Sequence, residues 1–162
     1  MRAPVEVRLE RLQKLIERIE DESEKGYAII VEGRRDRDSL RTMGVTGPIH
    51  CVQSSRQNPF SFAQGLGNMK EVVILTDFDR QGVYLAKRLS RILNSQKVRA
   101  NLVLWRELRR LAKSDIRSIE ELPKYFQRLQ NVERGYPYLV SGYELPLLTK
   151  GRKRDSAHRR RG

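Results

Sequence analysis

Residues 71–82 read EVVILTDFDRQG and carry the strongest strand signal in the chain. Four of the first five, Val72 to Leu75, are apolar, which is typical of a strand buried in a parallel sheet. Asp77 and Asp79 follow directly, and Gly82 comes at the start of a helical pattern. Ligands of open parallel sheets bind beyond the carboxyl ends of the strands. The stretch therefore predicts a buried strand that ends in an acidic site.

The same order of strand and helix extends to both sides of this stretch. The expected strands are 27–31, 48–52, 71–75 and 98–105. The expected helices are 5–24, 36–43, 60–66, 80–93, 106–112 and 119–130, the last with a capping box made by Ser118 and Glu121. Alternating strands and helices indicate βαβ units. We expect an α/β, Rossmann-like fold with a mostly parallel four-stranded sheet flanked by helices.

Four segments are expected along the chain. They are an amphipathic helix within 1–26, the α/β domain at 27–112, a helical extension at 113–134, and an extended arm with a basic tail at 135–162. The apolar residues of the first helix lie on one face: Val5, Leu9, Leu12, Ile16 and Ile19. This face either packs on the domain or forms a coiled-coil seam with a second copy.

The chain has 162 residues and a net charge of +13, which favours polyanionic partners. Residues 150–162 hold seven basic residues and one acidic residue and so carry +6, while the rest of the chain carries the other +7. Nucleic acid is favoured over a membrane, because no basic amphipathic helix with an aromatic face is found. The chain has neither a bilayer-spanning apolar run nor a signal-peptide pattern. Its single cysteine, Cys51, excludes an internal disulfide, and we expect a cytoplasmic protein.

Glu32 ends the first predicted strand as Asp77 and Asp79 end the third. These acids can converge if the two strands are neighbours in the sheet. Oxygen ligands in small number suit Mg²⁺, and Glu32 would act as a general acid or base or as a further ligand. The structural alternative is that Asp79 caps the helix at 80 and that Asp77 accepts hydrogen bonds from loop amides.

The run Val31-Glu32-Gly33, followed by residues 75–82, LTDFDRQG, resembles the Toprim domain over about residues 25–112. That domain is shared by bacterial primases, type IA and type II topoisomerases, OLD-family nucleases, recombination mediators and a ribosomal-RNA-maturing ribonuclease. The resemblance implies a compact Rossmann-like sheet, proton transfer by Glu32, and magnesium held by Asp77 and Asp79. Arg80 and Gly82 match the frequent Asp-Arg-x-Gly ending.

Departures from the family pattern argue against several classes of Toprim protein. Val83 and Tyr84 stand where type IA topoisomerases usually carry another glutamate, so a third metal carboxylate is in doubt. The chain has no Walker A loop, no four-cysteine zinc site, and no room for a strand-passage region or a further primase domain. A stand-alone small Toprim protein remains. The segment 31–40 is similar to the ribonuclease pattern, with Arg34 in place of lysine, and Asp36 either orients the site or caps a helix.

Basic and hydroxyl side chains are expected at the same edge of the sheet and along the tail, where they would hold phosphates unless they are only solvated. The candidates are Arg34, Arg35, Ser54, Ser55, Arg56, Arg80, Lys150, Arg152, Lys153, Arg154, Arg159, Arg160 and Arg161. Tyr136, Tyr138 and Tyr143 are candidates for stacking on RNA bases. Tyr125 and Phe126 are expected in a helix core, and His50 and Cys51 are expected to be structural.

Three functions fit these features. The first is a magnesium-dependent nuclease that acts on structured RNA, as in ribosomal-RNA maturation. The second is a non-catalytic RNA-binding protein associated with the ribosome or its assembly, and the third is an accessory factor in DNA repair or replication.

Overall fold

The structure is a computed structural model that describes residues 2–136. The strands are β1 (Ala28–Val31), β2 (Ile49–Cys51), β3 (Glu71–Ile74) and β4 (Arg99–Asn101). The α-helices are α1 (Val5–Glu24), α2 (Arg34–Thr42), α3 (Pro59–Gln64), α4 (Arg80–Ser95), α5 (Val103–Ala112) and α6 (Leu122–Glu133). Two short 3-10 helices are η1 (Gln53–Ser55) and η2 (Ile119–Glu121). The tail and most of the arm predicted at 135–162 lie outside the described residues.

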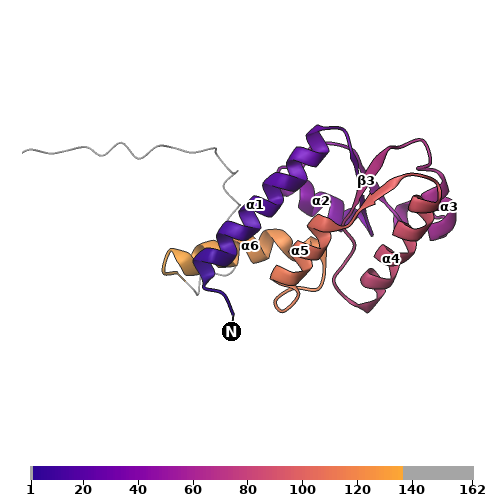
Figure 1. The fold of residues 1–162 in the computed structure, drawn as a ribbon. Helices are drawn as coiled ribbons and strands as arrows, with labels where there is room; N and C mark the ends of the chain where they lie inside the picture. The colour runs from indigo at the N-terminus through magenta and orange to yellow at the C-terminus, as the bar shows by residue number, and fades with distance from the viewer. Residues whose placement is uncertain (1, 137–162) are drawn as a thin grey trace, which may run out of the picture.

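The four strands form one parallel sheet in the order β2-β1-β3-β4, which confirms the predicted α/β architecture. In Figure 1, α3 and α4 lie on one side of the sheet, and α1, α2, α5 and α6 lie on the other. The chain leaves β1 for α2 and leaves β3 for α4, so these two neighbouring strands send their helices to opposite faces. A crevice is expected where two neighbouring strands diverge in this way.

The apolar strand residues form the centre of the core. All four residues of β1 are buried, as are Val72, Val73 and Ile74 of β3. This burial on both faces agrees with their continuous apolar sequences. The α6 residues Tyr125 and Phe126 are also buried, as predicted.

The apolar face of α1 packs within the chain. Leu9, Leu12, Ile16 and Ile19 are buried, and α1 contacts α5 and α6. Because the stripe is already covered, the structure supports packing on the domain rather than a coiled-coil seam. No helix among residues 2–136 is long and apolar enough to cross a membrane.

The prediction of a strand over 98–105 was wrong in its second half. β4 is only three residues long, and α5 already begins at Val103, whose amide donates to Asn101 Oδ1 at 3.0 Å. Leu104 and Trp105 are buried from a helix together with Leu108 and Ala112. A short apolar run does not distinguish a strand from the buried face of a helix, and the missed signal was Asn101, whose side chain accepts from the first amide of α5.

The start of α2 also differs from the prediction of 36–43. The helix begins at Arg34 with Gly33 at the N-cap, so Asp36 lies in the first turn and is not the cap. At η2, by contrast, the predicted capping box is present: the Glu121 carboxylate accepts from the amide and the hydroxyl of Ser118, at 2.9 and 3.0 Å.

Candidate functional site

Glu32 and Asp77 lie at the carboxyl ends of the neighbouring strands β1 and β3, where the chain diverges. Both residues line one groove with a volume of about 590 Å³. Segments far apart in sequence build its wall, and the lining residues are Glu32, Gly33, Arg34, Arg35, Asp36, Gln53, Ser54, Arg56, Asp77, Ser118 and Glu120. The predicted convergence of Glu32 with Asp77 is therefore present. Asp79 is exposed just outside this lining.

Each of the three predicted acids is held by one backbone amide. Glu32 Oε1 accepts from the Asp77 amide at 3.1 Å, and Asp77 Oδ1 accepts from the Ile119 amide at 3.0 Å. Asp79 Oδ1 accepts from the Gly82 amide at 2.7 Å and so caps α4. The helix-cap interpretation of Asp79 and the loop-amide interpretation of Asp77 are both correct as local descriptions. One carboxylate oxygen on each residue has no hydrogen-bond donor among the described residues.

The loop after β3 is fixed by close backbone contacts. A Cβ atom on Gly82 would lie 2.1 Å from the Asp77 carbonyl oxygen, so only glycine fits there. The Thr76 hydroxyl donates to the Gly82 carbonyl at 2.8 Å, and the Trp105 indole donates to the Thr76 carbonyl at 2.9 Å. Both side chains are buried. The position of Asp77 is therefore set by main-chain packing.

Asp36 is a further acid of this groove, and unlike Glu32 and Asp77 it is buried. Its side chain accepts from the Gly33 amide at 2.9 Å and from the Glu120 amide at 3.1 Å, and the residue is 5% exposed. It joins α2 to η2 and orients the loop after Glu32. The sequence offered this role as one alternative, but the contribution of residues 118–120 was missed. Their capping box marked a helix start and contained no sign that its amides face Asp36 and Asp77.

Crowding of acids in a half-buried groove changes their protonation. Burial raises the pKa of Asp77 to about 7; the hydrogen bond from Ile119 opposes this rise, and the charges of Asp36, Glu32 and Asp79 add to it. Burial also raises the pKa of Glu32 and of Asp36 above their ordinary values. Like charges at short range disfavour ionisation of one another. A bound cation would relieve this repulsion.

The donor set fits a magnesium ion held by few protein ligands. Mg²⁺ usually takes one or two carboxylates and completes its octahedron with water and phosphate oxygens. Glu32 and Asp77 each present one uncommitted oxygen to the groove or its edge. No group of three His, Cys, Asp or Glu side chains within residues 2–136 is arranged to hold an ion. The two uncommitted oxygens fit a site in which water and phosphate complete the coordination.

Some of the predicted phosphate-binding residues line the groove, two lie outside it, and the rest lie beyond the described residues. Arg34, Arg35, Ser54 and Arg56 line the groove with the acids. Ser55 instead donates its hydroxyl to the Val52 carbonyl at 2.7 Å, within its own turn. The exposed Arg80 lies at the start of α4 outside the groove lining. The tail candidates lie beyond the described residues: Lys150, Arg152, Lys153, Arg154, Arg159, Arg160 and Arg161.

Comparison with known proteins agrees with this geometry. The Toprim domain model matches residues 27–104. A UPF0292 protein of Methanosarcina barkeri is 35% identical over 130 residues, which cover 80% of this chain and 89% of that protein. A UPF0292 protein of Thermococcus gammatolerans is 39% identical over 123 residues, covering 76% and 91%. A solved structure of an Aquifex aeolicus protein has a TM-score of 0.56 at 23% identity, covers 67% of this chain and 94% of its own, and supports the fold alone.

Proposed function

Because this chain belongs to the UPF0292 family and is a small Toprim-domain protein, we propose that it is a magnesium-dependent protein that cleaves structured RNA, as in ribosomal-RNA maturation. A Toprim domain indicates a metal-dependent function related to nucleic acid. The proposal of RNA cleavage rests on the groove in which Glu32 and Asp77 lie beside Arg34, Arg35 and Arg56. Carboxylates for a metal and arginines for phosphates are the two parts that phosphodiester chemistry needs.

The residues take separate roles in this proposal. Asp77 and Asp79 would hold the ion through their uncommitted oxygens, and the groove arginines would position the phosphates. Bound magnesium supplies Lewis-acid stabilisation of charge on the phosphate. Glu32, oriented by the Asp77 amide, would transfer the proton of the attacking water or of the leaving oxygen. Such proton transfer typically contributes about 10²–10⁴-fold to a rate.

The direct test measures cleavage with and without magnesium. Precursor ribosomal RNA and duplex DNA are incubated with wild type, Glu32→Gln and the Asp77→Asn/Asp79→Asn double variant. Asp38→Asn is the matched control, because it removes a carboxylate from an exposed position of α2 outside the groove. We expect magnesium-dependent RNA cleavage that both site variants lose and the control keeps. Unchanged cleavage by Glu32→Gln would disprove its role in proton transfer.

Asp79 needs a test of its own because it also caps α4. Asparagine is as good an N-cap residue as aspartate. Asp79→Asn should therefore keep the thermal stability of the protein while it weakens magnesium binding, measured by calorimetric titration. If magnesium affinity is unchanged and the fold is intact, Asp79 serves only as the cap.

The second candidate is a non-catalytic RNA-binding protein associated with the ribosome. It is favoured by the donor set, because no group of three His, Cys, Asp or Glu side chains among residues 2–136 is placed to hold a metal ion. Tight RNA binding that never yields cuts, and that the Asp77→Asn/Asp79→Asn variant retains, would support this function. Preference for duplex DNA in the same assay would support an accessory role in DNA repair or replication.

A further inference from the structure

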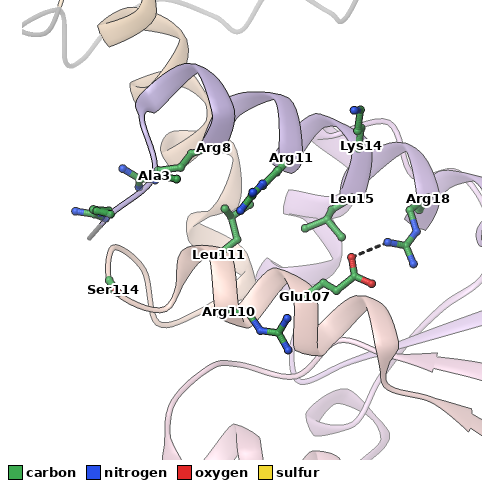
Figure 2. Close-up of a pocket in the computed structure, with 11 residues that line it drawn as sticks. Ala3, Arg8, Arg11, Lys14, Leu15, Arg18, Glu107, Arg110, Leu111 and Ser114 are labelled. Carbon is green, nitrogen blue, oxygen red and sulfur yellow. Dashed lines mark hydrogen bonds and ion pairs between the residues drawn. The ribbon is translucent and has the colours of Figure 1, made fainter.

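A second groove lies between α1 and α5, outside the acidic site, and has a volume of about 710 Å³. Figure 2 shows its two walls, with Arg11 between the helices and the Arg18–Glu107 ion pair joining them. Its basic lining residues are Arg2, Arg8, Arg11, Lys14, Arg18 and Arg110. Glu107 is the only acidic residue of the lining. The groove is therefore strongly positive.

The cations at one end of the groove are structural. The buried Arg8 donates to Asp115 at 2.5 Å and to the Tyr125 hydroxyl at 2.6 Å, and Arg2 pairs with the same aspartate. This cluster joins α1 to α6 and to the segment after α5. Its charge is largely balanced inside the protein, so these two arginines add little to the attraction of an outside anion.

Farther along the groove, Arg18 is paired across it with Glu107, but two other cations are not balanced. Arg11 and Arg110 are exposed and form no ion pair with any residue from 2 to 136. The partner of Lys14 is Glu10, an exposed neighbour on its own helix, and such pairs contribute little. Uncompensated like charges on facing helices are unfavourable for folding. An external anion would relieve this repulsion.

Spacing along α1 arranges its groove cations in one row, because Arg11, Lys14 and Arg18 follow each other at three- and four-residue steps. On α5, Arg110 lines the groove, and the exposed Arg106 and Lys113 lie four and three residues from it, outside the lining. A seven-residue span of helix is roughly 10 Å long, which matches about three phosphates of one strand counted along the axis of a duplex.

The same helix connects the groove to the acidic site. One face of α5 lines the groove, while another face contacts the loop that carries the aspartates. Trp105 donates to the Thr76 carbonyl at 2.9 Å, and Arg109 Nε donates to the Phe78 carbonyl at 3.3 Å. A strand lying in the groove would be about one helix diameter from that loop, roughly 10 Å.

We propose that the α1–α5 groove binds the phosphate backbone of a nucleic acid, as a second surface distinct from the acidic groove. A row of cations on α1, with Arg110 on α5, matches a polyanion of regular charge spacing, and such cations read no base sequence. The inference shares only the class of partner with the proposed function. It requires neither magnesium nor cleavage.

The test measures binding in EDTA by fluorescence anisotropy, with labelled RNA hairpins and duplex DNA across a range of salt concentrations. The groove variant is Arg11→Gln/Lys14→Gln/Arg110→Gln. The matched control is Lys70→Gln/Lys87→Gln/Arg91→Gln, which removes the same charge from exposed positions outside the groove. Thermal denaturation confirms that both variants are folded, since glutamine is a good helix former.

We expect the groove variant to bind at least tenfold more weakly than the control at about 0.1 M salt. The slope of log K against log salt should fall by about 2 to 3, the value for three lost phosphate contacts. Equal binding and equal slopes for the two variants would overturn the inference. So would binding only to anionic lipid vesicles or to polyglutamate and not to either nucleic acid.

The proposed function and this inference can fail separately. Loss of cleavage in Asp77→Asn/Asp79→Asn with normal binding in EDTA leaves the groove assignment intact. If the protein never cleaves RNA but the groove variant loses affinity, the groove assignment is supported and the nuclease proposal is contradicted. If the groove variant cleaves and binds as the control does, the nuclease proposal is supported and the groove assignment is contradicted.

Discussion

Replacing Gly82 by alanine tests whether the steric cost in the loop outweighs the higher helix propensity of alanine. Gly82 lies in the first turn of α4, and alanine within a helix is usually favoured over glycine by about 1 kcal/mol. Here, however, the new Cβ would meet the Asp77 carbonyl oxygen at 2.1 Å and its carbonyl carbon at 2.6 Å. Both atoms belong to the main chain, so no side-chain rotation relieves the contact.

The magnitude follows from the displacement required. An ordinary contact begins at 3.4 Å, so the two backbone segments must separate by about 1.3 Å. Overpacking typically costs about 1–3 kcal/mol. The separation also stretches the Gly82–Asp79 and Thr76–Gly82 hydrogen bonds, which contribute about 1 kcal/mol each. After the gain in helix propensity, we expect a net loss of about 3 kcal/mol and a melting temperature lower by roughly 10 °C.

The assay is thermal denaturation together with calorimetric titration of magnesium. Gly65→Ala is the control: its conformation is right-handed, and the nearest atom to its Cβ would be the Phe62 carbonyl oxygen at 3.3 Å. We expect the control to be nearly neutral, and Gly82→Ala to lose stability and magnesium affinity together. A Gly82→Ala protein as stable as wild type, with normal magnesium affinity, would refute the steric reasoning.

Three further predictions concern named contacts and are checked by chemical or thermal denaturation. Asp115→Ala leaves the Arg8 guanidinium buried without its carboxylate and should lower the free energy of unfolding by about 3 kcal/mol. Burial alone would raise the pKa of Asp115, but the hydrogen bond from Arg2 and the charges of Arg8 and Arg2 hold it below its usual value. Its contribution is therefore complete above about pH 4 and is lost as the pH falls through the folded-state pKa, so the difference between wild type and Asp115→Ala should close there. Trp105→Phe removes the donor to the buried Thr76 carbonyl and should cost about 1–3 kcal/mol. In EDTA at pH 8, Asp77→Asn should be more stable than wild type. The folded-state pKa of Asp77 is raised to about 7, so wild type loses stability as the pH rises from about 4 through that value. Equal stability at pH 8 would count against this shift.

The sheet and two of its site acids were predictable because their signals are local. Residues 28–31 and 72–75 are apolar throughout, as is typical of strands buried on both faces. Parallel strands bring their carboxyl ends to one edge, so the convergence of Glu32 and Asp77 was predictable on the condition that their strands are neighbours, which the pairing of β1 with β3 meets. The same reasoning could not show that Asp79 would stand outside the groove lining, because side-chain direction after a strand depends on the loop.

The features that the sequence did not predict depend on contacts between distant segments. The Ile119 amide reaches Asp77 across 42 residues, and the Glu120 amide reaches Asp36 across 84. Main-chain donors carry no residue-type signal, so no motif marks them. The α1–α5 groove was missed for a related reason. Arg11, Lys14 and Arg18 are ordinary surface residues of an amphipathic helix until α5 is placed opposite them.

The amide contacts also define how much of the chain the site requires. The Toprim model matches residues 27–104, yet the donor that orients Asp77 comes from η2, beyond that range. Without η2, Asp77 Oδ1 would lose its hydrogen bond from Ile119 and Asp36 Oδ1 its hydrogen bond from Glu120, while the repulsion between these acids would persist. The segment η2 contacts both α2 and α6, and α6 packs on α1. The acidic groove therefore requires residues beyond the range that the Toprim model matches, and α1, which packs on α6, also forms one wall of the α1–α5 groove.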